Sequence, residues 1–306
     1  MILLFVIFLA LVLGGSYFSY RTAFHAPDDL RGKHQSVQAP QYDPYRPRMR
    51  ELFRDFSERP FQTVTIRSHD GLTLSARYYH TAPNAPLDIC FHGYKSHPIT
   101  DFSGGSSLSF ALGHNLLLVD QRGQHDSEGH TITFGILERW DVLSWAEYAI
   151  EQFGEDVKIT LYGVSMGGAT VLMAAGLPLP EQVKGIVADC PFAVPEEIIL
   201  NVGQKQHYPP ALIRPFLHLG AGLWGRFRLS ETDALQAVSQ ARIPILIIHG
   251  EDDSYVPCYM SAPVAQANPS LVRRYTFPGA DHAISLLVDE ERYRGIITGF
   301  TEEILA

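Results

Sequence analysis

A serine inside a glycine-flanked pentapeptide is the best candidate nucleophile in the chain. Residues 163–167 read Gly-Val-Ser-Met-Gly, with Ser165 in the middle and another glycine, Gly168, directly afterwards. An apolar, β-favouring run precedes the pattern and a run of small and aliphatic residues follows it, so we expect a strand that turns directly into a helix. Such a corner is strained, admits only small residues two positions away, and raises the serine hydroxyl at the N-terminus of the helix. The alternative is a glycine-rich turn whose serine only caps the helix.

His282 and Asp253 have the residue types and positions that would activate this serine. Each of them stands in a loop that directly follows a predicted strand. A histidine can take the hydroxyl proton as general base, and a carboxylate can hold the imidazole in the required tautomer. The order Ser, Asp, His along the chain is expected when three strand ends of a doubly wound sheet converge.

The assignment of the carboxylate leaves competitors. Glu251 and Asp252 stand beside Asp253 in the same loop, and Asp189 follows another predicted strand. All of these positions lie near the carboxyl ends of strands, where ligands bind in open α/β sheets. The sequence favours Asp253 and keeps the other three as alternatives.

The end of an earlier predicted strand supplies donors for a developing oxyanion. His92, Gly93 and Tyr94 follow this strand. We expect the backbone N–H groups of Tyr94 and Met166 to form the oxyanion hole, and the Tyr94 hydroxyl is an alternative donor. For His92 we expect a structural imidazole that braces the loop.

The elements that must position these residues alternate along the chain. We expect a β-hairpin over residues 62–79 and short apolar strands at 87–91, 115–119, 159–164, 183–188, 243–248 and 273–277. Helical spacing covers residues 136–153, 257–267 and 289–304. Strands that alternate with helices predict an α/β fold with a doubly wound, mostly parallel sheet over residues 61–306.

One segment, residues 192–241, interrupts this alternation with about fifty residues that contain no convincing strand. An insertion of this length in an α/β domain is usually a lid or cap, so we expect a helical cap. Its apolar residues could line a substrate site or simply pack on the core. The candidate substrate-binding residues are Phe192, Phe216, Leu217, Leu223 and Trp224.

The composition excludes several classes of protein. Of the 306 residues, 46% are hydrophobic and 19% are charged, which is typical of a globular chain. A net charge of −9 without a dense basic patch argues against nucleic acid as a partner. The three cysteines, Cys90, Cys190 and Cys258, are too few and too scattered for a disulfide framework or a zinc site.

Residues 1–20 contain no charged side chain and are mostly large and apolar. A helix of this length spans about 30 Å, so the segment predicts a single transmembrane anchor. A signal peptide cleaved near residues 14–16 is the alternative, although a basic n-region is missing. Arg21, Arg31 and Lys33 follow the span, which favours a cytoplasmic catalytic domain. We expect residues 21–60, which are polar and proline-rich, to form a linker or a surface arm.

Taken together, several motifs make the chain resemble serine hydrolases of the α/β-hydrolase superfamily, in the esterase and serine-aminopeptidase-like branch and of the bacterial membrane-anchored type. The resemblance extends from about residue 61 to the C-terminus. It rests on residues 68–72, 92–93, 120–123, 127–129, 163–168, 249–257 and 280–282. One departure lies after Asp120, where Gln124 and His125 replace the usual residues, so His125 could alter this loop or intrude on the rim of the site.

The resemblance implies attack by Ser165 on an acyl carbonyl, followed by release of the acyl-enzyme by water, with no metal or organic cofactor. We expect hydrolysis of a carboxylic ester with an apolar acyl group, such as one drawn from lipid beside the anchor. Thioesters and small amides are the nearest variants. A serine aminopeptidase, an acyltransferase and a non-catalytic scaffold at the membrane remain as alternatives.

Overall fold

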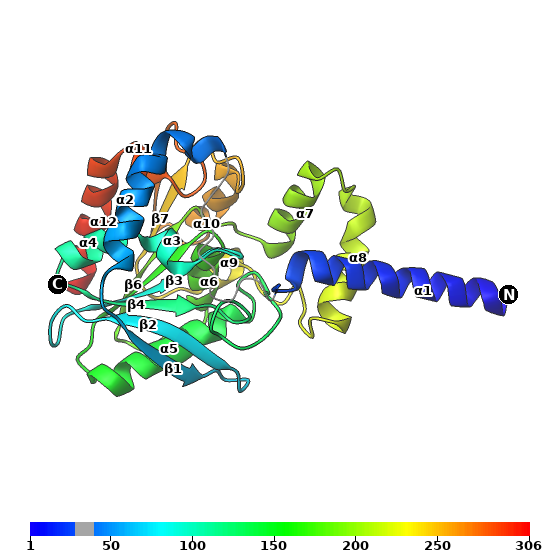
Figure 1. Ribbon diagram of the computed structural model, residues 1–306, viewed down its shortest axis with the longest axis horizontal. Coiled ribbons are helices and arrows are strands. Elements are labelled where there is room, and N and C mark those ends of the chain that lie inside the picture. Colours follow the sequence, from blue (N-terminus) through cyan, green and yellow to red (C-terminus); the bar gives the residue numbers. More distant parts are fainter. Residues whose placement is uncertain (28–39) are drawn as a thin grey trace.

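A single eight-stranded sheet forms the centre of the protein (Figure 1). The computed structural model describes residues 1–27 and 40–306. The strands follow the order β1-β2-β4-β3-β5-β6-β7-β8 across the sheet, in which β2 runs antiparallel to both of its neighbours and the strands from β3 onwards run parallel. The strands are β1 Gln62–Arg67, β2 Thr73–Tyr79, β3 Leu87–Phe91, β4 Asn115–Asp120, β5 Ile159–Val164, β6 Val183–Asp189, β7 Ile245–Gly250 and β8 Val272–Phe277. The predicted α/β class with a mostly parallel sheet is confirmed.

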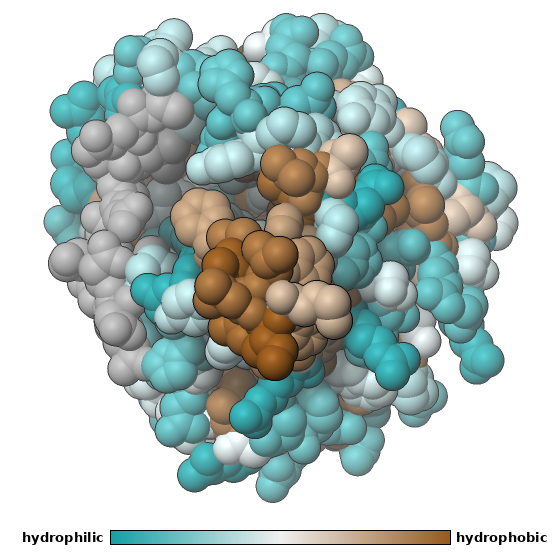
Figure 2. Space-filling view, turned by 90° about the vertical axis from the view of Figure 1, so that its right-hand side faces the viewer, coloured by the Kyte–Doolittle hydropathy of each residue, from teal (hydrophilic) through white to brown (hydrophobic). Residues whose placement is uncertain are grey.

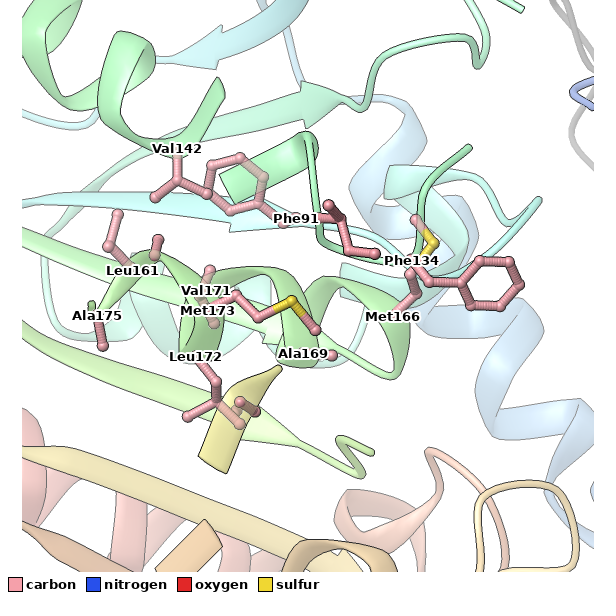
Figure 3. Close-up of a cluster of buried hydrophobic side chains, with 14 of the residues drawn as sticks. Phe91, Phe134, Val142, Leu161, Met166, Ala169, Val171, Leu172, Met173 and Ala175 are labelled. Carbon is pink, nitrogen blue, oxygen red and sulfur yellow. The ribbon is translucent and has the colours of Figure 1, made fainter. Parts of the chain in front are cut away.

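The central strands are apolar at nearly every position because helices cover both faces of the sheet. Alternate residues of β3 show this: Ile89 and Phe91 join the core on one face, and Cys90 joins the core on the other. The first face is covered by α5 Glu138–Phe153, α6 Met166–Ala174, α9 Ala234–Ser239 and α10 Ala262–Ala267. Figure 3 shows part of this core, where side chains of α6 lie near Phe91 and Leu161 of the strands.

The second face is covered by helices from three parts of the chain, residues 40–57, 98–111 and 285–305. They are η3 Pro40–Tyr45, α2 Arg46–Ser57, α3 Pro98–Phe102, α4 Ser106–Ala111, α11 Ser285–Val288 and α12 Glu290–Leu305, and a short 3-10 turn, η4 Cys258–Ser261, precedes α10. Tyr42 and Phe56 are buried beneath this layer. The C-terminal part of the segment predicted as a linker or arm is therefore helical and packed on the sheet. Residues 28–39, with Arg31 and Lys33, lie outside the described residues.

The N-terminal helix α1 Ile2–Ser19 projects away from the sheet and continues into a π-helical turn, η1 Tyr20–Phe24 (Figure 1). Among the described residues, Ile2–Phe24 is long and apolar enough to cross a membrane, a test that a signal sequence also passes. Most of its surface is exposed, but Ser16, Tyr20 and Phe24 are buried against the rest of the protein. The last turns of this helix are therefore part of the folded body.

Two helices of the predicted cap, α7 Pro195–Lys205 and α8 Pro210–Leu223, stand beside α1 (Figure 1). The helices α1 and α8 cross closely at Gly220, where an added Cβ would lie 2.7 Å from the carbonyl oxygen of Ser16. The indole N–H of Trp224 donates to Ser16 Oγ at 3.1 Å, and the Trp224 ring packs edge-on against Tyr17. The two helices thus form one packed unit, while α9 packs separately against α6.

A buried arginine joins the hairpin, β4 and α5. Arg122, just after β4, donates through Nε and Nη2 to the two carboxylate oxygens of Asp141 in α5, each at 2.6 Å. Its Nη1 donates to Asp70 in the β1–β2 turn at 2.9 Å. The motif residues around Asp70 and Arg122 therefore have a structural role, away from the serine.

We predict that Arg122→Leu destabilises the protein far more than Arg273→Leu. Removing Arg122 leaves the Asp141 carboxylate buried without its counter-charge, which typically costs about 3–5 kcal/mol. Arg273 makes a similar two-bond pair with Glu303, but both side chains are about half exposed, so its loss should cost about 0–1 kcal/mol. Chemical denaturation of the two variants at pH 7 measures this difference, and equal losses would contradict it.

Candidate active site

Ser165 occupies a strained corner between β5 and α6. Its backbone lies at φ 57° and ψ −115°, in a region that residues with a side chain rarely adopt. The glycines on either side allow this corner, because a Cβ on Gly163 would overlap the backbone of Gly167, and a Cβ on Gly167 would overlap the carbonyl of Phe91. The Ser165 N–H donates to the carbonyl oxygen of Asp189 in the neighbouring strand at 2.8 Å. The predicted sharp strand-to-helix turn is present.

Ser165, His282 and Asp253 lie in one hydrogen-bonded row. The Nε2 atom of His282 lies 3.0 Å from Ser165 Oγ, and its Nδ1 atom lies 2.7 Å from Asp253 Oδ2. The three residues come from loops after β5, β8 and β7, whose carboxyl ends meet at one edge of the sheet. This spacing is within reach for proton transfer from a serine to an imidazole.

The Asp253 carboxylate is buried and held in its charged form. Burial alone would favour the neutral acid, but hydrogen bonds from His249 and His282 lower the pKa of Asp253 well below its usual range. Its Oδ1 atom also accepts the backbone N–H groups of Tyr255 and Val256, at 2.9 and 2.7 Å. A charged carboxylate in a fixed position is what an imidazole needs in order to stay in one tautomer with Nδ1 protonated.

The competing carboxylates point elsewhere. Glu251 accepts a hydrogen bond from the Thr276 hydroxyl at 2.6 Å, and Asp252 is exposed. The Asp189 carboxylate accepts from the Tyr293 hydroxyl at 2.8 Å, and burial raises the pKa of Asp189 to about 6. Of the four candidates, Asp253 is hydrogen-bonded to the His282 ring.

Two contacts that the sequence did not predict fix the loop of His282. The hydroxyl of Tyr42, from the packed arm, donates to the His282 carbonyl oxygen at 3.1 Å. The carboxylate of Asp281 accepts the backbone N–H groups of both His282 and Ser254, each at 2.7 Å, and so joins the loops after β8 and β7. Tyr42 lies in a proline-rich segment far away in sequence, where no pattern indicated a role at the site.

The loop after β3 comes directly over Ser165. An added Cβ on Gly93 would lie 3.5 Å from Ser165 Cβ, and the Gly93 N–H donates to the partly buried Asp101 carboxylate at 2.7 Å. Tyr94 and Met166, the two predicted oxyanion donors, line the same cavity as Ser165. The Tyr94 hydroxyl donates to the carbonyl oxygen of Ala23 at 2.8 Å, away from the serine. The geometry therefore favours the backbone N–H of Tyr94 over its hydroxyl as an oxyanion donor.

His92 and His125 brace this loop from below. The Nε2 atom of His92 accepts the backbone N–H of Gln121 at 3.1 Å, so Nδ1 carries the proton and donates to the Gly93 carbonyl. Burial and the neighbouring His125 lower the pKa of His92 to about 3, so its ring is neutral. His125 adopts φ 51° and lies 2.6 Å from the Ser96 carbonyl through Nε2. His125, the departure from the usual family pattern, thus lies beneath the loop of residues 92–94. It is not among the described residues that line the cavity.

A cavity of about 480 Å³ opens above Ser165 between the sheet edge, the cap and α1. This volume suits a small organic ligand. Phe192, Phe216 and Leu217 line it, as predicted for the cap, whereas Leu223 and Trp224 are not among the described lining residues and lie exposed at the end of α8. The α1–η1 segment contributes Gly15, Phe18, Ser19, Thr22 and Ala23 to the wall, a role that hydrophobicity alone did not indicate.

One group of potential metal ligands exists within the described residues, and it overlaps this row. Atoms of Cys190, Asp253 and His282 lie within 4.8 Å of one another. His282 and Asp253 already bond to each other, and burial raises the pKa of the Cys190 thiol well above its ordinary value, so the sulfur remains protonated. Because His282 and Asp253 already bond to each other and His282 also lies 3.0 Å from Ser165 Oγ, we assign the group to the serine–histidine–aspartate row.

Comparisons with known proteins agree with this fold. The family model of the alpha/beta hydrolase fold matches residues 89–223. The uncharacterized protein YqkD of Bacillus subtilis is 25% identical over 258 residues, which cover 83% of each chain. The thiohydrolase aneE of Aspergillus aculeatus is 28% identical over 144 residues, which cover 46% of this chain and 45% of that protein.

Among solved structures, the esterase Pf2001 of Pyrococcus furiosus superposes with a TM-score of 0.68 at 19% identity. The match covers 90% of this chain and 98% of that one. At this level of identity the likeness concerns the fold, which extends over almost the whole of both chains.

We predict that Asp189→Asn stabilises the protein more at pH 7 than at pH 4. Below about pH 4 the carboxyl is protonated in both the folded and the unfolded state. Between about pH 4 and 6 the unfolded state releases the proton while the folded state keeps it, so the stability of the wild type falls as the pH rises. An asparagine does not titrate and can still accept from Tyr293. Between pH 4 and pH 7, the free energy of unfolding of Asp189→Asn should therefore rise by about 2–3 kcal/mol relative to that of the wild type.

Chemical denaturation at pH 4 and pH 7 measures this growth. Asp252→Asn, at an exposed position, is the matched control and should show no such change. An identical effect of Asp189→Asn at both pH values would contradict the prediction.

Proposed function

Because the chain belongs to the α/β-hydrolase superfamily, we propose that it is a serine hydrolase that cleaves carboxylic esters through an acyl-enzyme. The observation that carries the proposal is the row in which His282 lies 3.0 Å from Ser165 Oγ and 2.7 Å from Asp253. A strained serine that is held at the N-terminus of a helix, within hydrogen-bond reach of the His282 imidazole, is arranged to act as a nucleophile.

The proposed reaction has two steps. His282 takes the proton of Ser165 as Oγ attacks the acyl carbonyl, and Asp253 stabilises the resulting imidazolium. The backbone N–H groups of Tyr94 and Met166 would bind the oxyanion, and each donor of this kind is worth about 3–4 kcal/mol. His282 then gives the proton to the departing alcohol, and a water activated by His282 releases the acid and restores Ser165.

The lining of the cavity supports an apolar acyl group. Its wall is mostly aliphatic and aromatic, and Lys95 is the one charged residue among the described residues that line it. A serine aminopeptidase would need an acidic group to bind the free amine of its substrate, so the lining favours an esterase. Thioesters fit the same chemistry, and the match to a protein named as a thiohydrolase keeps them as the nearest variant.

We also propose that α1 is retained as a membrane anchor. Cleavage near residues 14–16 would remove Gly15 from the cavity wall and Ser16 from its bond with Trp224. Arg21 lies in the turn η1, just after α1, which supports a cytoplasmic catalytic domain. Sodium carbonate extraction of membranes, together with the N-terminal sequence of the purified protein, would test retention. A mature protein that begins after Ser16 would contradict it.

We expect Ser165→Ala to abolish labelling by a fluorophosphonate and to lower ester hydrolysis by at least about 10⁴-fold. The reagent phosphonylates an activated serine hydroxyl, and alanine has none. Gel fluorescence and hydrolysis of a short p-nitrophenyl ester measure the two effects on purified full-length protein. Persistent labelling of Ser165→Ala would show that another residue is the nucleophile.

Asp253→Asn should lower kcat by about 10⁴-fold, because an amide in this place favours the wrong tautomer of His282. The neighbouring Asp252→Asn is the matched control, since Asp252 is exposed in the same loop, and it should stay within about twofold of the wild type. Steady-state kinetics on the same ester decides. A large loss in Asp252→Asn and a small one in Asp253→Asn would reverse the assignment.

A further inference from the structure

The N-terminal helix is a wall of the substrate cavity as well as an apolar span. Phe18, Ser19 and Thr22 line the cavity together with Ser165 and cap residues. Phe18 of α1 is 56% exposed and Leu212 of α8 is 62% exposed, although both line the cavity. The cavity therefore opens to the surface beside residues that are themselves apolar.

Several contacts fix this helix in place against the catalytic domain. Tyr20 Oη lies 2.9 Å from Thr131 Oγ1, and His25 forms a β-bridge with Thr131. The Tyr94 hydroxyl, from the loop above Ser165, donates to the Ala23 carbonyl. The helix thus has one defined position relative to the serine.

The length of the free part of α1 sets how deep the cap must lie in a bilayer. Near the end of α1, an added Cβ on Gly14 would meet no atom within 4 Å, whereas one on Gly15 would lie 2.8 Å from the Phe216 ring of α8. Residues 2–14 therefore project for about 20 Å, at 1.5 Å per residue. The hydrocarbon core of a bilayer is about 30 Å thick, so the projecting part falls short by about 10 Å. The shortfall is made up if the crossing of α1 and α8 is itself immersed.

The surface of α8 fits such immersion. Leu212, Leu219 and Leu223 are exposed on one stripe of the helix, at spacings of seven and four residues. Trp224, which directly follows α8 and contacts Ser16 and Tyr17 of α1, is 41% exposed, and tryptophan is typical of the membrane interface. Figure 2 looks at this face of the molecule and shows an apolar area centred on the projecting helix.

We propose that the substrate is an ester of a membrane lipid whose acyl chain enters the cavity sideways from the bilayer, between α1 and α8. This inference rests on the proposed serine hydrolase activity. The acyl chain lies along Phe18, Leu212 and Phe216, and its carbonyl reaches Ser165. The ester C–O bond breaks, the alcohol leaves with the proton from His282, and water then releases a fatty acid from Ser165.

A pair of chain-length probes tests the wall formed by α1. Full-length protein in phospholipid vesicles is labelled with an ethyl and with a dodecyl fluorophosphonate, and the rate of inactivation is measured for each. Ser19→Trp places a large ring on the cavity wall, whereas Ala10→Trp places the same ring on an exposed position of α1 outside the lining. We expect the dodecyl-to-ethyl rate ratio to fall at least tenfold in Ser19→Trp and to stay unchanged in Ala10→Trp.

A second pair keeps the test decisive if Ser19→Trp does not fold. Phe18→Ala removes an exposed ring that lines the cavity, and Phe5→Ala removes an exposed ring on the same helix outside the lining. We expect only Phe18→Ala to change the rate ratio, by at least threefold. A ratio that none of the lining variants changes would overturn the role of α1 in binding the acyl chain.

The route of entry is tested with a fluorogenic long-chain ester that is confined to vesicles. The ester is placed either in the vesicles that carry the protein or in separate vesicles at the same total concentration. Entry from the bilayer predicts at least tenfold faster hydrolysis in shared vesicles, while equal rates would overturn it. Absence of ethyl labelling at Ser165 in the wild type would instead defeat the proposed hydrolase activity, so the two failures are distinguishable.

Discussion

The close approach of Gly167 to the Phe91 carbonyl is the constraint on which the rest of the site depends. With no side chain at this position, α6 can begin directly above the sheet and hold Ser165 at a positive φ. The same approach places the serine next to the end of β3, so the loop that carries Tyr94 lies over it. β6, β7 and β8 follow β5 across the sheet, and they bring Asp253 and His282 to the same edge. A strained backbone of this kind persists because the surrounding structure leaves it no alternative.

The row of Ser165, Asp253 and His282 could be predicted because each residue stands at the end of an apolar strand, and parallel strands bring such ends together. The parallel sheet could be predicted from the same runs. Tyr42 could not, since its bond to the His282 carbonyl depends on how a segment about 240 residues away folds over the sheet. Asp101 was missed for a similar reason: its role is to hold one backbone N–H in a loop, and no periodic pattern marks this.

The cap shows the limit of reasoning from hydrophobicity. Five apolar residues were predicted to bind the substrate, and three of them, Phe192, Phe216 and Leu217, line the cavity above Ser165. Leu223 and Trp224 have the same character but lie on the outer surface of α8. Composition indicates that a residue avoids water, and only the packing of α8 against α1 determines whether it faces a cavity, a core or a bilayer. The contribution of α1 to the cavity wall could not be predicted either. A candidate membrane span already accounted for the hydrophobicity of residues 1–20, so nothing in the sequence pointed to a second role.

The close crossing of α1 and α8 at Gly220 restricts which residues can occupy the C-terminal end of α1, but it does not restrict the N-terminal end. Around Leu3 to Leu9 any large apolar side chain would serve, since these positions face outward. At Gly15 and Ser16 the neighbouring helix is so close that bulk is excluded and a hydroxyl is bonded by Trp224. An apolar helix of the same length from an unrelated protein could also span a membrane, but it would not restore this fit. The first twenty residues are therefore not interchangeable with a generic hydrophobic tail.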